Sequence, residues 1–274
     1  MTMYTILRNA FLLALSTLAI LSCATASSGN QAGGFDPGQP TVLITGSNRG
    51  IGLALTRHYA GAGWNVIATA RNPVKADELN ALAAGDPTVI VEQLDVTDLE
   101  RINGLADAYQ GVPVDVLINN AAVLGDLGGQ FYGSLDYDQF QWTMAVNVFG
   151  PMAMAEAFEP HVAASKQKKI LTLTSGLGSL TLMSKMQGMT YYRISKAGVN
   201  MGMRAIRANL IKDGIIVALI APGMVQTQLL ADSGYTGKAL TPDESAAGMA
   251  GIIAGLTLDD SGKPTNVDGK TIPW

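Results

Sequence analysis

The sequence contains a tyrosine and a lysine whose spacing suits proton transfer. Tyr192 and Lys196 lie four residues apart, and on a helix this spacing places two side chains on the same face. A tyrosine hydroxyl ordinarily has a pKa near 10, and lowering it to about 7 requires about 4 kcal/mol of preferential stabilisation of the phenolate. One positive charge about 4 Å away contributes roughly that much at an effective dielectric constant of about 20. The pair therefore predicts an acid–base tyrosine, whereas Tyr191 has no lysine four residues after it.

A glycine-rich segment forms the second candidate site. Gly46, Gly50 and Gly52 follow directly after an apolar run. Glycine permits a tight turn, and it lets a pyrophosphate approach the backbone N–H groups at the start of the following helix. The spacing T-G-x-x-x-G-x-G differs from the usual dinucleotide pattern G-x-G-x-x-G. The alternative interpretation is a tight turn that packs closely and binds nothing.

Short apolar runs alternate with longer helical stretches in the rest of the chain. Buried parallel strands have this continuous apolar character, without alternation between polar and apolar residues. The pattern predicts a single doubly wound Rossmann-type α/β domain, with a mainly parallel sheet flanked by helices on both faces. The expected strands are residues 41–45, 64–70, 89–94, 114–119, 169–174 and 215–220, and the first helix is 51–60.

The N-terminus differs in composition from the remainder. Arg8 precedes the apolar run 10–22, which is shorter than the roughly 20 residues of a membrane-spanning helix. Small residues follow, so residues 1–26 are predicted to be a secretory signal cleaved after Ala26 or a lipoprotein signal with lipid attached at Cys23. The protein is then exported or membrane-associated. A retained extension on a cytoplasmic protein is the alternative.

Domain boundaries follow from composition. Residues 27–40 are rich in Gly, Pro and Ser and predict a flexible linker. Residues 41–274 are expected to form the folded domain.

Overall composition excludes several classes of protein. The 274 residues are 48% hydrophobic and 15% charged, as in soluble globular proteins. The net charge of −4 offers no general attraction to nucleic acid. One cysteine excludes an intrachain disulfide framework, and two histidines without ligand spacing argue against a metal site.

Several motifs together resemble the short-chain dehydrogenase/reductase family over most of residues 41–274. They are the glycine turn, Asp95-Val96, N-N-A-A at 119–122, Asn147, and Tyr192-x-x-x-Lys196. The C-terminal residues 266–274 resemble the sniffer and C-factor branch of carbonyl reductases. Ala122 departs from the family, which commonly has glycine there.

The resemblance implies a role for each matching residue. Asn147, Ser175, Tyr192 and Lys196 would perform catalysis, with Asn147 positioning a water. Ser179 competes with Ser175: it lies 13 residues before Tyr192 rather than 17, closer to the family spacing, but the motif at the strand end favours Ser175. The implied cofactor-binding residues are Gly46, Ser47, Asn48, Arg49, Gly50, Ile51, Gly52, Arg71, Asp95, Val96, Asn120, Tyr192, Lys196, Pro222, Gly223, Val225 and Thr227.

The end of the second expected strand indicates which cofactor is used. An NAD-binding protein would present a carboxylate to the ribose hydroxyl there, and residues 66–71 contain none. Arg71 and Arg49 could instead bind the 2′-phosphate of NADP(H). The alternative is that both are ordinary surface arginines.

The segment after residue 227 is expected to cover the substrate. Residues 228–240 are polar and contain glycine, which suits a mobile lid. Thr241 is predicted to cap the next helix, with Pro242 at its first position and Glu244 completing a capping box.

The sequence thus predicts an NADP-dependent carbonyl reductase or alcohol dehydrogenase that acts on a small carbonyl or alcohol substrate, with a homo-oligomer as a further expectation. In carbonyl reduction Tyr192 would donate the proton and Ser175 would bind the developing alkoxide. A non-catalytic NADP-binding sensor or interaction protein is the alternative. An epimerase of the extended family fits less well, because its glycine spacing and second domain are missing.

Overall fold

The computed structural model describes residues 33–183 and 187–274. The expected signal at 1–26 lies outside the described residues. In the described part a seven-stranded sheet has the order β3-β2-β1-β4-β5-β6-β7, and all its pairings are parallel. The strands are β1 (Thr41–Ile44), β2 (Asn65–Ala70), β3 (Val89–Gln93), β4 (Val116–Asn119), β5 (Lys169–Leu173), β6 (Ile216–Ala221) and β7 (Pro264–Asn266).

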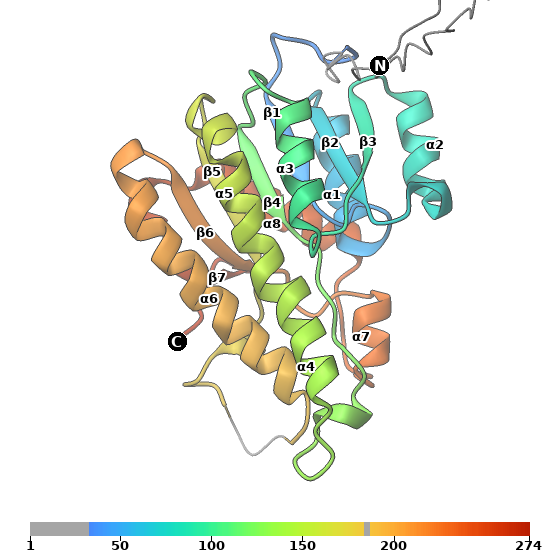
Figure 1. Cartoon of the computed structure of the whole chain (residues 1–274), viewed down its shortest axis with the longest axis vertical. Coiled ribbons are helices and arrows are strands. Elements are labelled where there is room, and N and C mark those ends of the chain that lie inside the picture. Colours follow the sequence, from blue (N-terminus) through green and yellow to red (C-terminus); the bar gives the residue numbers. More distant parts are fainter. Residues whose placement is uncertain (1–32, 184–186) are drawn as a thin grey trace, which may run out of the picture.

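Helices cover both faces of this sheet (Figure 1). The helix α1 (Gly50–Gly61) packs with α8 (Pro242–Gly255) on one face, and α3 (Leu99–Ala108), α5 (Gly150–Ala163) and α6 (Thr190–Leu210) cover the other. The shorter helices are α2 (Asp77–Gly85), α4 (Tyr137–Met144) and α7 (Gln228–Asp232). Within the described ranges, no helix combines the length and apolar character needed to cross a membrane.

The two apolar layers explain the continuous apolar strands. Val42 and Ile44 of β1 belong to the core beneath α1 and α8, whereas Leu43 between them belongs to the core on the other face. Val42 pairs in register with Val66 of β2 and Val116 of β4. A central strand buried on both sides has no solvent-facing positions for polar residues. The predicted doubly wound Rossmann-type fold is confirmed.

The six predicted strands all form, with ends that differ by one or two residues. The seventh strand, β7, was not predicted. It has three residues and begins with Pro264, at the edge of the sheet beyond β6. A strand this short carries no readable pattern, and proline is tolerated at a strand's first residue.

Ordered contacts begin before Thr41, where the folded domain was expected to start. The Asp36 backbone N–H donates to Asn65 Oδ1 at 2.9 Å, and Asn65 Nδ2 donates to the carbonyls of Asp36 and Gln39. The Phe35 ring lies 6.3 Å from that of Tyr109. The last part of the expected linker therefore packs on the domain. Phe35 and the side chain of Asn65 in β2 make these contacts, which the average composition of residues 27–40 does not reveal.

The sheet order places the candidate residues at one edge. The strands β2 and β4 flank β1, so the chain leaves β1 toward one side and later returns to the other. The carboxyl ends of such strands diverge and leave a crevice, which is the usual ligand site of this topology. The glycine turn follows β1, Asp95 follows β3, Asn120 follows β4, Ser175 follows β5 and Pro222 follows β6.

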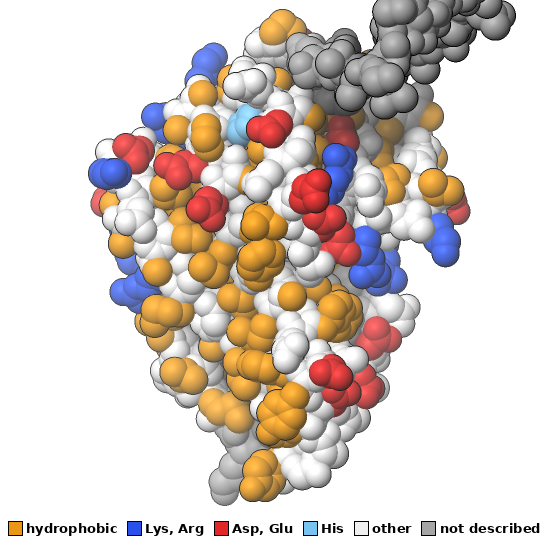
Figure 2. Space-filling model, viewed as in Figure 1, with side chains coloured by type: hydrophobic (Ala, Val, Ile, Leu, Met, Phe, Trp, Pro, Cys, Tyr) orange, Lys and Arg blue, Asp and Glu red, His pale blue; other side chains and the backbone are white. Residues whose placement is uncertain are grey.

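The face that carries α4, α5 and α6 exposes apolar side chains. Figure 2 shows them gathered along the middle of this face. Trp142, Phe149 and Met201 are 40%, 42% and 68% exposed. Exposed apolar patches often mark contacts with other molecules, and the expected homo-oligomer stays a prediction.

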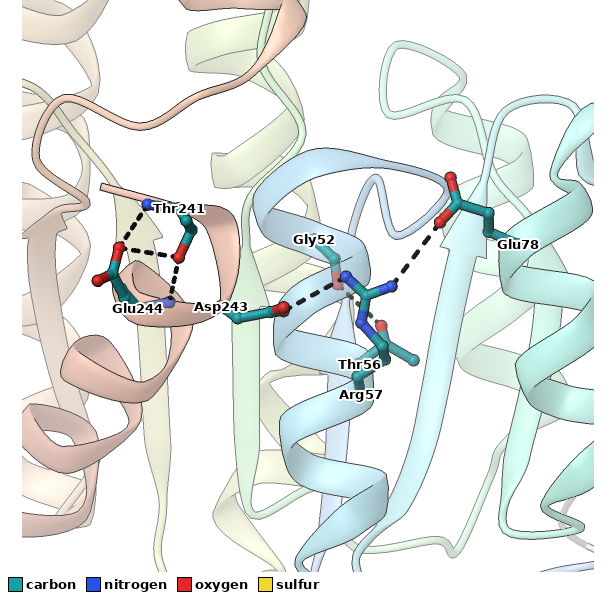
Figure 3. Close-up of polar contacts among 7 residues, drawn as sticks. All are labelled: Gly52, Thr56, Arg57, Glu78, Thr241, Asp243 and Glu244. Carbon is teal, nitrogen blue, oxygen red and sulfur yellow. Dashed lines mark hydrogen bonds and ion pairs between the residues drawn. The ribbon is translucent and has the colours of Figure 1, made fainter. Parts of the chain in front are cut away.

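The start of α8 has the predicted capping box (Figure 3). The Thr241 Oγ1 accepts from the Glu244 backbone N–H at 3.2 Å, and the Thr241 N–H donates to Glu244 Oε2 at 2.7 Å. Arg57 of α1 then connects two neighbouring helices, since it pairs with Asp243 of α8 at 3.3 Å and with Glu78 of α2 at 3.8 Å. These bonds set where α8 begins beside α1.

Thr241→Ala should lower the free energy of unfolding by about 1 kcal/mol, the usual contribution of a helix cap. The substitution leaves the Glu244 N–H without its acceptor. Denaturant titration measures the change. Thr241→Ser keeps the hydroxyl and should retain most of the stability, so equal losses in both variants would contradict a capping role.

Candidate functional site

A cavity of about 1320 Å³ lies along the carboxyl edge of the sheet. Its volume exceeds that of pockets for single drug-sized ligands, so a long ligand fits. Nearly all the residues that the family resemblance implicated line it together. They are Gly46, Asn48, Arg49, Gly50, Ile51, Gly52, Arg71, Asp95, Val96, Asn120, Ser175, Tyr192, Lys196, Pro222, Gly223, Val225 and Thr227.

The glycine turn has a geometry that only glycine permits. Gly46 and Gly50 have positive φ angles of 72° and 56°. A Cβ on Gly52 would lie 2.2 Å from the Gly46 carbonyl oxygen. Asn120 Nδ2 donates to the carbonyls of Thr45 and Gly46, which ties the turn to the end of β4. Contacts within the protein thus hold the turn, and the start of α1 borders the cavity.

Ser47 does not line the cavity, although it was expected to bind the cofactor. Its hydroxyl donates to the Ile44 carbonyl, its N–H donates to the Thr69 carbonyl, and its side chain is fully buried. Ser47 therefore shapes the turn from behind. Ala122 does line the cavity, and its φ is negative, so this departure from the family pattern imposes no backbone strain.

Positive side chains gather where the cavity passes β2. Arg49 lies in the glycine turn and Arg71 directly follows β2. Lys75, in the 3₁₀ turn that follows, also lines the cavity and was missed from the sequence, where it lies beyond the strand end. The nearby carboxylate of Glu78 pairs with Arg57. This part of the cavity can accept an anionic group.

Tyr192 and Lys196 approach Ser175 from the first turns of α6. The Ser175 side chain lies close enough to the Tyr192 hydroxyl to lower the pKa of that hydroxyl. Lys196 Nζ donates to the Leu173 carbonyl at 2.9 Å and lies 5.7 Å from the centre of the Tyr192 ring. A Cβ on Gly178 would lie 2.7 Å from the Lys196 backbone, so glycine lets the chain after β5 pack against α6. The arrangement places a phenol, a hydroxyl and an ammonium group together.

The competing residues lie elsewhere. Ser179 is buried, accepts a hydrogen bond from the Leu182 N–H and does not line the cavity. Tyr191 is also buried away from the cavity, and in the described part of the chain its hydroxyl has no hydrogen-bond partner.

Burial decides the protonation of the tyrosine. It raises the pKa of Tyr192 to about 12, although the hydrogen bond from Ser175 lowers it. Burial also lowers the pKa of Lys196 to about 8. The expectation that Lys196 brings the tyrosine pKa to about 7 is therefore wrong in this structure. The ammonium group binds the Leu173 carbonyl, and burial disfavours the charged phenolate.

Asn147 contacts neighbouring segments of the chain rather than the cavity itself. It lies in a π-helical turn, Ala145–Phe149, and does not line the cavity. Its Oδ1 accepts from the Val123 N–H at 2.9 Å, and its Nδ2 donates to the Val123 carbonyl and to Ser195 Oγ. The side chain joins the segment after β4 to α6, and its positioning of a water stays a prediction.

The segment after β6 forms part of the cavity wall. A short parallel bridge joins Val225 to Leu240. The residues expected to form a lid contain α7, whose first turn is capped by Thr227 Oγ1 accepting from the Leu230 N–H at 3.3 Å. The polar composition hid this helix, which is five residues long. Mobility of the lid stays a prediction.

Apolar side chains from α7 and from the segments after β4, β5 and β6 also line the cavity, and sequence patterns did not identify them. Met189 precedes α6 with a φ of 53°, an uncommon conformation for any residue but glycine. Isolated apolar residues in loops carry no signal of a site. These apolar lining residues are Leu124, Leu177, Met189, Met224, Leu229, Leu230 and Tyr235.

Comparison with known proteins supplies the family. The profile described as short chain dehydrogenase matches residues 40–236. The chain belongs to this family, and the protein is an oxidoreductase. It is 35% identical over 237 residues to the 1-hydroxy-2-glutathionyl-2-methyl-3-butene dehydrogenase of Rhodococcus sp. (strain AD45), covering 85% of this chain and 99% of the relative.

Solved structures of carbonyl reductases have a closely similar fold. The NADPH-bound carbonyl reductase from chicken fatty liver has a TM-score of 0.78 and 29% identity, over 86% of this chain and 99% of the other. The carbonyl reductase Sniffer of D. melanogaster has a TM-score of 0.77 and 24% identity, over 86% of this chain and 100% of the other. At that identity the likeness to Sniffer concerns the fold.

Proposed function

We propose that the protein uses NADP(H) to interconvert a small apolar carbonyl compound and its alcohol, with Tyr192 as the acid–base group. The observation that carries this proposal is the cavity that contains both the glycine turn with its neighbouring arginines and the Ser175–Tyr192–Lys196 cluster. A site built only to hold a dinucleotide has no need for a buried phenol beside a hydroxyl.

The cavity residues fit NADP(H). The cofactor, when bound, supplies or accepts a hydride at its nicotinamide ring. The open start of α1 would hold the pyrophosphate, and Arg49 and Arg71 would hold the 2′-phosphate. Asp95 and Val96 lie where an adenine would pass, whereas Val225 and Thr227 line the cavity after β6. The carbonyl reductase from chicken fatty liver was solved with NADPH bound, which supports the same choice here.

Tyr192, Ser175 and Lys196 would carry out the proton transfer. During reduction the carbonyl carbon receives the hydride, and Tyr192 Oη gives its proton to the carbonyl oxygen, so the product is a neutral alcohol. Ser175 would donate a hydrogen bond to the oxygen as negative charge develops on it. The ammonium group of Lys196 would stabilise the phenolate that remains. A pKa of Tyr192 raised to about 12 keeps the donor protonated before the reaction.

The lining beside Tyr192 favours an uncharged substrate. Within the described lining, the residues from α6, α7 and the segments after β4, β5 and β6 are uncharged apart from Lys196. The other lining cations, Arg49, Arg57, Arg71 and Lys75, come from α1 and the segment after β2. A carboxylate on the substrate would therefore lose its hydration, and the cation beside it, Lys196, already binds the Leu173 carbonyl.

The test is a panel of carbonyl compounds with NADPH, monitored by loss of NADPH absorbance. Aromatic aldehydes, diketones and quinones should be reduced, and each should react faster than a matched compound that carries a carboxylate. Faster reduction of the carboxylated compounds would contradict the substrate class. Tight binding of NADPH with no reduction of any compound would contradict the activity and favour a sensor.

The rate of carbonyl reduction should fall as pH rises through about 8, where Lys196 loses its proton. Tyr192, with a pKa of about 12, stays protonated over this range, so the lysine and not the tyrosine causes the decline. A pH profile of kcat measures it. Lys196→Arg keeps its charge in alkali and should remove the decline. A wild-type rate that stays constant well above pH 8 would contradict this assignment.

A further inference from the structure

We propose that Gln130 is a positioning residue that holds the first turn of α6, and with it Tyr192, against the substrate side of the cavity. The inference rests on the proposed role of Tyr192 as proton donor. Gln130 lies in the connection between β4 and α4, about sixty residues before the tyrosine.

The helix that carries Tyr192 has no cap of its own. Its N-cap residue, Met189, has a φ of 53° and makes no side-chain hydrogen bond to the helix. The N–H groups of a first helical turn have no acceptor within the helix. Gln130 Oε1 supplies one, because it accepts from the Tyr191 N–H at 3.1 Å and from the Tyr192 N–H at 3.0 Å.

The nitrogen of the same side-chain amide binds the segment that follows β4. Gln130 Nε2 donates to the Leu124 carbonyl at 2.8 Å and to the Asp126 carbonyl at 3.2 Å. The backbone carbonyl of Gln130 also accepts from Thr190 Oγ1 at 2.7 Å. Leu124 lines the cavity, as does Tyr192. One side chain therefore fixes the distance between the segment after β4 and the tyrosine.

The chemistry of this position requires a neutral amide. Gln130 is fully buried, so each of its polar atoms needs a partner within the protein. Its oxygen faces two donors and its nitrogen faces two acceptors. A glutamate would keep the acceptor but press an oxygen against two carbonyls, and a methionine would fill the space without either kind of bond.

Loss of the Gln130 hydrogen bonds should displace Tyr192 more than Lys196. Tyr192 belongs to the turn that Gln130 caps, whereas Lys196 lies one turn further along and is held by the Leu173 carbonyl. Freeing the first turn should therefore misplace the phenol while leaving the glycine turn and its neighbouring cations intact. Turnover should suffer, and cofactor affinity should not.

The matched pair of variants is Gln130→Met and Thr143→Val. Thr143 is also fully buried beside Gly125, but its hydroxyl has no hydrogen-bond partner among the described residues. Gln130→Met should lower kcat at least about 10-fold, since a displacement of about 1 Å can cost about 100-fold, and should leave NADPH affinity within about twofold. Thr143→Val should match the wild type. An unchanged kcat in Gln130→Met, or an equal loss of NADPH affinity, would overturn the proposal.

Amide hydrogen exchange separates this proposal from the proposed activity. With NADPH present and no substrate, the amides of residues 187–196 should exchange faster in Gln130→Met than in the wild type or Thr143→Val. Unchanged protection would overturn the positioning role. A wild-type protein that reduces no carbonyl would contradict the proposed function, and this exchange measurement would still decide the role of Gln130.

Gln130→Glu provides a second test of the proposal if Gln130→Met does not fold. A protonated glutamic acid keeps one acceptor and one donor, so it imitates the amide, and its ionised form does not. We expect its kcat to approach the wild-type value at low pH and to decline as pH rises, at pH values where the wild type is constant. A profile parallel to that of the wild type would overturn the proposal.

Discussion

Tyr192→Phe will lower the turnover of carbonyl reduction by about 100- to 10,000-fold, the usual contribution of a positioned general acid. The affinity for NADPH should stay within about twofold, because the ring still packs against the cavity wall and only the hydroxyl is lost. Fluorescence titration with NADPH and steady-state rates with a reactive member of the carbonyl panel measure the two quantities.

The neighbouring tyrosine is the control. The Tyr191 hydroxyl is buried and makes no hydrogen bond within residues 33–183 and 187–274, so Tyr191→Phe should leave turnover unchanged. Ser175→Ala should mainly lower turnover, by about 3 kcal/mol of transition-state stabilisation. Lys196→Ala should damage both binding and turnover, since it removes the charge beside the phenol. Full turnover in Tyr192→Phe would eliminate the mechanism.

Arg71→Asp will reverse the cofactor preference from NADPH to NADH. Arg71 is an exposed cation on the cavity wall at the end of β2, where a 2′-phosphate would lie. A hydrogen bond to a charged group contributes about 1.5–3 kcal/mol, so NADPH affinity should fall by about 100-fold when a carboxylate replaces the guanidinium. The same carboxylate can accept bonds from the ribose hydroxyls of NADH.

Two further variants show whether the effect is local. Arg49→Gln should weaken NADPH binding by a smaller factor, because Arg71 and Lys75 remain. Arg101→Gln removes the same charge from a residue that pairs with Glu92 outside the cavity, and it should leave both affinities unchanged. A wild-type protein that binds NADH as tightly as NADPH would contradict the charge argument at β2.

The sequence alone was sufficient for the architecture and for most of the cavity. Six strands were predicted because a strand buried on both faces must be continuously apolar, a property that neighbouring residues display directly. The parallel topology then brings every strand's carboxyl end to one edge. Motifs that follow strands, such as the glycine turn and Ser175, therefore had to meet there. The capping box at Thr241 was equally local, since its partners lie three residues apart.

Only the tertiary structure decided how these residues work together. The approach of α6 to the chain after β5 placed Ser175 in the cavity and buried Ser179. Burial set the pKa of Tyr192 opposite to the direction predicted from the charge of Lys196, because desolvation depends on the whole surroundings of a group. Gln130 contacts residues about sixty positions away, and Phe35 packs near Tyr109. Such contacts leave no periodic or local signal, because packing alone brings these residues together.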